Sequence, residues 1–175
     1  SVCSSPCGRN DDYDMSLLWS AGEDIRSLKS LILFGIRGMA AYAFHAMVLG
    51  YTNAELYRFI ARALFTVGSD LDVEKLLPVV MEVGKYNLAC MELLDRANTE
   101  TFGSPVPTEV TMKVEKGPFI VISGHDLLDL KLLLEQTEGK GVNIYTHGEM
   151  LPAHAYPQLK KYPHLKGNFG TAFSK

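Results

Sequence analysis

The most constraining feature of this chain is a pair of short apolar runs with a helical pattern between them. The runs are residues 118–123 and 141–146. Helical spacing of apolar residues extends from Asp126 to about Gln136. A strand, a helix and a second strand joined this closely form a βαβ unit with parallel strands and a right-handed crossover. The sequence therefore predicts one such unit in the second half of the chain.

A short polar segment comes directly after each of the two apolar runs. Residues 124–126 read Gly-His-Asp, and residues 147–150 read His-Gly-Glu-Met. Parallel strands end at one edge of a sheet, where open α/β sheets bind ligands, so we expect His125 and Glu149 to lie there together. An imidazole and a carboxylate can form half of a transition-metal site. Taken alone, His125 could equally be a surface or capping residue, and Glu149 a first-turn acid favoured by the helix macrodipole.

The first half of the chain has helical periodicity that predicts a three-helix bundle. The first helix extends from Asp24 to Gly50, and the second begins at a capping-box pattern over 52–55 and ends at Gly68. Asp70 or Asp72 can cap the third. We predict that its buried stripe comprises Leu76, Leu77, Val80, Met81, Leu88, Met91 and Leu94, with Met39, Tyr42 and the thiol Cys90 also in the core.

Two prolines within residues 103–107 oppose helix and place a domain boundary there. The predicted organisation is a cysteine-bearing leader (1–22), a helical bundle (23–103) and a partial α/β domain (104–175). The fold class is thus α plus α/β, a three-helix bundle followed by the opening βαβ unit of a Rossmann-like parallel-sheet domain. An edge strand over 109–114 and a short helix near Gln158 complete the expectation.

Composition narrows the class of protein. With 175 residues, 47% of them hydrophobic, and a net charge of −3, the chain is expected to be soluble, with neither nucleic acid nor membrane as partner. The apolar stretch 31–49 contains Arg37 and His45, which favours a buried bundle helix over a membrane span. Three cysteines without a secretory signal predict a cytoplasmic protein. The missing initiator Met suggests a piece of a longer polypeptide.

Four segments resemble the hybrid cluster protein (prismane) family, also called hydroxylamine reductases: residues 83–88, 91–99, 123–126 and 145–154. The last segment is the most specific. The resemblance implies that His125 and Glu149 are ligands of a hybrid iron–sulfur–oxygen cluster and catalytic residues. It also implies a small nitrogen-oxide substrate, since the family reduces hydroxylamine to ammonia and nitric oxide to nitrous oxide, and a redox partner protein as electron donor.

The amino-terminal region resembles the part of the family that binds a 4Fe-4S cluster through four cysteines. Cys7, followed by Gly8 and Arg9, matches the last cysteine, and Cys3 would be the preceding ligand. The gap between them is shorter than the family's, and the first cysteine pair is missing. Both could instead be reduced thiols on one helical face.

The family's other hybrid-cluster ligands, which are several cysteines, a glutamate and a lysine, come from regions beyond Lys175. The chain therefore resembles an amino-terminal portion of the shorter, single-bundle form. Two alternatives stay open. One is a metal enzyme of the carbon monoxide dehydrogenase type, which has a similar fold, although the His-Gly-Glu-Met block speaks against it. The other is a non-catalytic fragment or binding module.

Overall fold

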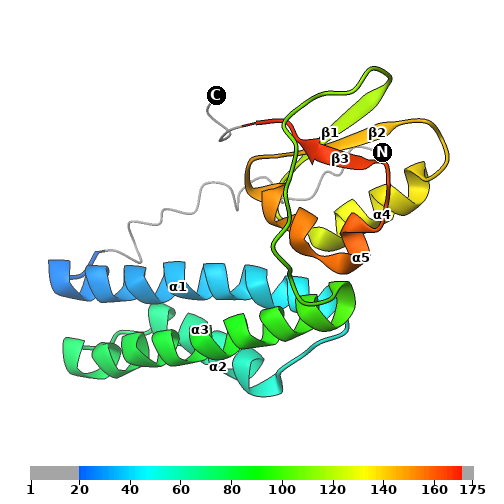
Figure 1. Cartoon of the computed structure of the whole chain (residues 1–175). Helices are drawn as coiled ribbons and strands as arrows, with labels where there is room; N and C mark the ends of the chain where they lie inside the picture. Colours follow the sequence, from blue (N-terminus) through cyan, green and yellow to red (C-terminus); the bar gives the residue numbers. More distant parts are fainter. Residues whose placement is uncertain (1–19, 171–175) are drawn as a thin grey trace, which may run out of the picture. The chain divides into compact units, whose positions relative to one another are not determined.

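The computed structural model describes residues 20–170 (Figure 1), so Cys3 and Cys7 lie outside the described part. Its elements are α1 (Glu23–Val48), α2 (Ala54–Gly68), α3 (Val73–Phe102), β1 (Phe119–Ser123), α4 (Leu127–Thr137), β2 (Asn143–His147), the 3₁₀ helix η3 (Gly148–Ala155), α5 (Pro157–Lys160) and β3 (Leu165–Asn168). Three helices followed by a parallel βαβ unit confirm the predicted fold class.

Side-chain caps set the starts of α2 and α3. The Asn53 side chain accepts hydrogen bonds from the backbone N–H groups of Glu55 (3.0 Å) and Leu56 (3.2 Å), so the cap is Asn53 and not Thr52, the first residue of the expected capping box. Asp72, not Asp70, caps α3, because its Oδ1 accepts from the backbone N–H of Lys75 at 3.0 Å. Each cap satisfies donors that a helix start leaves unpaired.

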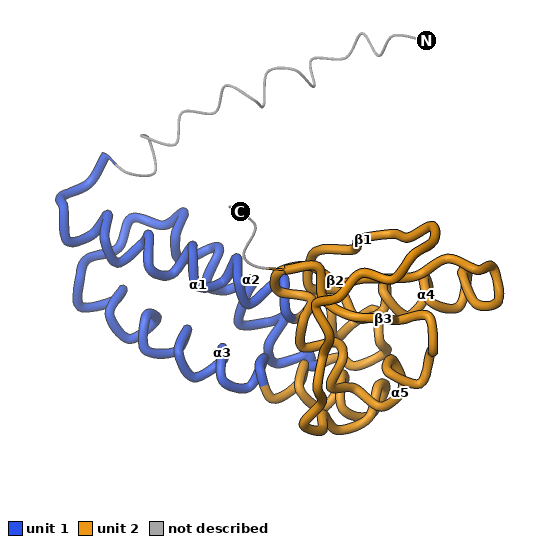
Figure 2. The backbone as a smooth tube through the Cα atoms, turned by 45° about the horizontal axis from the view of Figure 1, so that its top comes forward, with its two compact units in different colours: residues 1–42, 53–91 blue, residues 43–52, 92–175 orange. Residues whose placement is uncertain are grey.

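The chain divides into two compact units (Figure 2), residues 1–42 with 53–91 and residues 43–52 with 92–175. These limits fall inside α1 and α3, so the domain boundary expected near residue 103 stays a prediction. The core of the first unit includes Ile32, Ile36, Met39, Leu56, Phe59, Ala63, Val67, Leu76 and Cys90.

Cys90 confirms its predicted role as a core thiol. It is fully buried, and its Sγ donates to the backbone carbonyl of Met39 at 3.3 Å. Burial raises the pKa of the Cys90 thiol, because the low-dielectric surroundings disfavour the thiolate.

The predicted stripe of α3 is wrong in part. Leu76 is buried and Leu94 partly buried, but four apolar residues assigned to the core are exposed, as is Tyr42 on α1: Leu77, Met81, Leu88 and Met91. The buried face of α3 runs instead through Leu76, Cys90, Leu93 and Ala97. Apolar residues occur around the whole circumference of α3, so spacing alone does not select the face that packs.

The helix α1, which was predicted to be a buried bundle helix, is buried on one face only. Ile32 and Met39 are buried, whereas Leu31 and Phe34 are exposed. Among the described helices, α1 is the one long and apolar enough, by length and composition, to cross a membrane, and 28% of its most apolar stretch is buried. Core helices of soluble proteins share that length and composition, so the absence of a membrane partner stays a prediction.

The second unit is built on a three-stranded parallel sheet in the order β1-β2-β3. The helices α4 and α5 lie on the same side of this sheet (Figure 1). They bury a core of Phe102, Leu130, Leu134, Ile144, Met150, Ala153, Leu159 and Tyr162. Leu130 and Leu134 of α4 are fully buried in this core together with Ile144 of β2, so this face of α4 packs toward the sheet.

Two details of the sheet differ from the prediction. The expected edge strand over 109–114 is reduced to a single bridge, in which Thr111 pairs with Gly167. The strand β3 was not predicted, because its sequence Leu-Lys-Gly-Asn lacks the β-branched and aromatic residues that mark strands. The short helix expected near Gln158 is confirmed as α5.

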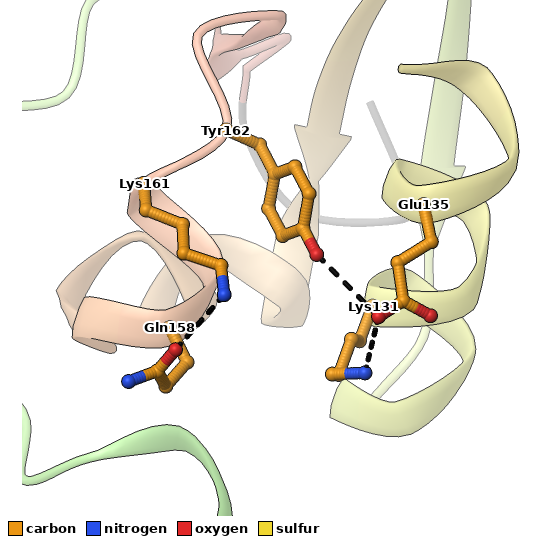
Figure 3. Close-up of polar contacts among 5 residues, drawn as sticks. All are labelled: Lys131, Glu135, Gln158, Lys161 and Tyr162. Atoms are coloured by element: carbon orange, nitrogen blue, oxygen red, sulfur yellow. Dashed lines mark hydrogen bonds and ion pairs between the residues drawn. The ribbon is translucent and has the colours of Figure 1, made fainter.

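Polar contacts on the surface join α4 to the end of α5 (Figure 3). Glu135 accepts hydrogen bonds from Lys131 on the same helix and from the Tyr162 hydroxyl. The Lys131 ammonium holds the pKa of Glu135 below its usual range. Since this group is at the surface, the pair contributes little to stability and Glu135 is a suitable control position.

Candidate metal centre

The strands β1 and β2 end side by side. Ser123 and His147 are the last pair of their ladder, and a glycine follows each. Gly124 has φ +122° and Gly148 has φ +56°, a region that residues with a Cβ rarely adopt. The two glycines turn the chain out of the sheet at the same edge, so that the next residue of each loop leaves the sheet there.

Those next residues are the two predicted donors, and the structure brings them together. His125 Nε2 is in contact with Glu149 Oε2, and the side chains are 68% and 56% exposed. The predicted juxtaposition at the carboxyl edge is therefore confirmed. Both donor atoms lie at an open surface, where a metal or cluster held by further ligands has access to them.

The loop that carries His125 is anchored through its neighbour Asp126. The Asp126 Oδ1 atom accepts from the backbone N–H groups of Leu128 (2.8 Å) and Asp129 (3.1 Å) and so caps α4. The second carboxylate oxygen lies 3.4 Å from Nδ1 of His45, in the last turn of α1. Sequence reasoning missed His45, because nothing in its local pattern signals a partner 81 residues away.

The loop that carries Glu149 is anchored by burial. Within η3, Met150, Ala153 and His154 are buried. His154 Nε2 lies 2.9 Å from Thr146 Oγ1, and this Oγ1 accepts a hydrogen bond from Asn168 Nδ2 at 3.0 Å. Burial lowers the pKa of His154, opposed by its hydrogen bond to the backbone of Gly167. This histidine therefore packs behind the loop and does not reach the exposed donors.

A cavity of about 540 Å³ adjoins the same loop. Its walls come from the extended segment before β1, from η3 and from the end of β3: Thr108, Val110, Met112, Leu151, Pro152, His154, Ala155, Asn168 and Gly170. The lining is mainly apolar, with the polar ends of His154 and Asn168 engaged in the network on Thr146.

The donor set fits part of a metal site. An imidazole nitrogen and a carboxylate oxygen are ligands that iron accepts. Among residues 20–170, no group of three or more His, Cys, Asp or Glu side chains is placed to hold a metal ion. His125 and Glu149 can thus supply two ligands, and a complete site needs donors from outside the described residues.

Comparison with known proteins adds the family. The family model described as "Prismane/CO dehydrogenase family" matches residues 8–175. The chain belongs to this family. Its curated relatives include hydroxylamine reductases of Caldanaerobacter subterraneus subsp. tengcongensis (52% identical over 161 residues), Moorella thermoacetica (54% over 153 residues) and Methanosarcina mazei (50% over 161 residues).

These relatives are much longer than the chain. The matches cover 91%, 86% and 91% of this chain but 29%, 36% and 30% of the respective relatives. The resemblance inferred from four sequence segments is therefore confirmed at the level of the family.

Proposed function

We propose that this chain is part of an iron–sulfur oxidoreductase that reduces hydroxylamine to ammonia, and in which His125 and Glu149 bind a hybrid iron–sulfur–oxygen cluster. The observation that carries the proposal is the contact between His125 Nε2 and Glu149 Oε2 at the carboxyl edge of the sheet. It is supported by family membership and by relatives named hydroxylamine reductase at 50% to 54% identity.

When bound, the cluster would supply iron and reducing electrons to a small nitrogen-oxide substrate, hydroxylamine or nitric oxide. His125 would hold one position through Nε2, and whatever bonds its second nitrogen would tune its basicity. Glu149 provides a hard oxygen donor. Because its side chain is 56% exposed on a loop with a buried backbone anchor, the carboxylate can exchange partners as substrate enters without moving the loop.

Cys3 and Cys7 would hold a 4Fe-4S cluster that relays electrons from a redox partner protein. Both residues lie outside the described part of the chain, so this assignment depends on the sequence resemblance. We further propose a cytoplasmic location, on the grounds of the three thiols and the reducing chemistry.

Two other functions remain as candidates. The matching family model also covers carbon monoxide dehydrogenases, which makes CO oxidation the second enzymatic reading. A non-catalytic fragment is favoured by one observation, the presence of only two adjacent donors among residues 20–170. An anaerobic iron assay separates this last reading from the others, because a binding module would carry no stoichiometric iron.

The decisive variant is Glu149→Gln in the full-length protein that contains this chain. The amide is a poor iron ligand of nearly equal size, so we expect hydroxylamine turnover to fall at least about 100-fold. Glu135→Gln is the matched control, a surface glutamate in the same unit that should leave turnover unchanged. A Glu149→Gln enzyme that assembles its cluster and keeps full turnover would overturn the assignment of Glu149.

CO oxidation without hydroxylamine reduction in the parent protein would favour the second enzymatic reading.

A further inference from the structure

We propose that His45 is a positioning residue for the candidate metal centre, acting through Asp126 to fix the loop that carries His125. Neither the sequence pattern nor the family comparison assigns His45 a role. The consequence for metal binding rests on the proposed function, whereas the effect on the loop does not.

The geometry gives Asp126 two separate tasks. Its Oδ1 atom accepts from the backbone N–H groups of Leu128 and Asp129 at the start of α4. Its Oδ2 atom lies 3.4 Å from His45 Nδ1, and the two side chains are 29% and 35% exposed. One oxygen therefore binds the carboxylate to the start of α4, and the other lies beside His45 in the last turn of α1.

The loop itself is open, although Ile122 before it and Leu127 after it pack against the core of the second unit. A Cβ added at Gly124 would meet no atom within 4 Å apart from its chain neighbours, so the loop is not packed on that side. The His125 side chain is 68% exposed and touches Glu149 from the other strand. Because His125 is not buried, its direction depends on its contact with Glu149 and on the backbone that joins it to Asp126.

The ring of His45 has its own support. Phe44 lies against it edge to face, with ring centroids 6.4 Å apart. The His45 side chain thus lies between an aromatic ring and a carboxylate and is an anchor for both neighbours. It ties the end of α1 to a loop 81 residues further along the chain. We infer that loss of this anchor lets residues 124–126 rotate and withdraws His125 from Glu149.

The first test uses the full-length protein prepared without iron, so that its outcome is independent of the proposed chemistry. Native-state hydrogen exchange is measured at the amides of Leu128 and Asp129. We expect His45→Leu to accelerate their exchange about tenfold, because the cap carboxylate loses its second attachment. His45→Asn retains an N–H group near the Nδ1 position and should restore most of the protection.

His164→Leu is the matched control. His164 Nε2 lies 3.0 Å from Thr137 Oγ1 and 3.1 Å from the carbonyl of Leu134, at the opposite end of α4. This variant should accelerate exchange at the end of α4 and leave its start unchanged. If His45→Leu does not fold, Asp126→Asn replaces it, because the amide keeps the cap oxygen and loses the second carboxylate oxygen.

The second test uses the iron-loaded protein and reads its electron paramagnetic resonance spectrum. We expect His45→Leu to retain iron but to alter the cluster spectrum, and His45→Asn to resemble the parent protein. Unchanged exchange and an unchanged spectrum in His45→Leu overturn the inference. A parent protein without iron refutes the proposed function, and the exchange data then still decide the role of His45.

Discussion

The two loops that bring His125 and Glu149 into contact are held in different ways. The loop 148–155 is anchored by its own buried side chains, with Met150 and Ala153 in the core of the second unit. The loop 124–126 buries no side chain of its own, and the polar contacts at its end are those of Asp126, ahead of Leu127, which packs against the same core. One donor is thus placed by hydrophobic packing and the other by electrostatic and hydrogen-bonded contacts.

The two kinds of anchoring have different consequences for the two donor side chains. The core fixes the backbone beneath Glu149 and leaves its carboxylate exposed, so the side chain can move while its loop stays in place. The position of His125 depends on a few polar contacts, so it is sensitive to single substitutions at their partners. Disturbing one loop at a time tests how far the two anchors are independent, given that the loops meet at the contact of His125 with Glu149.

The largest effect is expected for Met150→Ala. Met150 is 2% exposed within the core, and truncation of such a side chain costs about 2–5 kcal/mol through lost burial and the cavity left behind. Opening free energies of the β2 amides, from native-state hydrogen exchange, provide the measurement. Leu151→Ala, at the exposed neighbouring position, should cost less than about 0.5 kcal/mol. Equal losses at both positions would contradict the packing account.

Thr146→Val should have a smaller effect on the same loop. The change preserves shape but removes the oxygen that contacts His154 Nε2 and Asn168 Nδ2. Leaving buried polar groups unpaired costs about 1–3 kcal/mol. Exchange at the amides of η3 measures this loss, with exposed Thr108→Val as the control. A neutral Thr146→Val would show that the network does not stabilise the loop.

Asp126→Ala should affect the loop 124–126 and not the loop 148–155. Removing an N-cap side chain costs about 1 kcal/mol, so exchange should accelerate at the start of α4 and remain unchanged in η3. Asp129→Asn, in the first turn but without the capping role, should have less effect. Coupled changes in both loops would contradict their separate anchoring.

The smallest effect is a pH dependence confined to the loop 148–155. Burial holds the pKa of His154 in the folded state below the ordinary histidine value of 6.5, so the unfolded segment binds more protons between the folded-state pKa and 6.5. The free energy of opening of residues 148–155 should therefore be constant above about pH 6.5. It should fall as the pH decreases from 6.5 to the folded-state pKa of His154. Exchange measured as a function of pH in the parent and in His154→Gln tests this, since the variant should lack the decline.

Local patterns were sufficient to predict the framework of the site. The two apolar runs and the helix between them determine a parallel pair, and parallel strands necessarily end at one edge. The contact of His125 with Glu149 follows from that geometry and from glycines at both strand ends. These features depend on residues close to one another in the chain, which is why a single sequence reveals them.

The features that were missed depend on distant residues. His45 is recognised as an anchor only once α1 and the start of α4 are adjacent. The strand β3 contains Gly167, where an added Cβ would lie 2.2 Å from the carbonyl of Thr111, so close packing and not strand propensity accounts for its sequence. The exposed methionines of α3 show the same limitation, since periodicity identifies an apolar helix but not its buried face.

The most direct test of the central claim is an anaerobic crystal structure of the full-length protein with iron located by anomalous scattering. We expect an iron atom within coordination distance of both His125 Nε2 and Glu149 Oε2, with its remaining ligands from residues outside this chain. Iron bound elsewhere, or no iron beside this pair in a protein that carries stoichiometric iron, would contradict it.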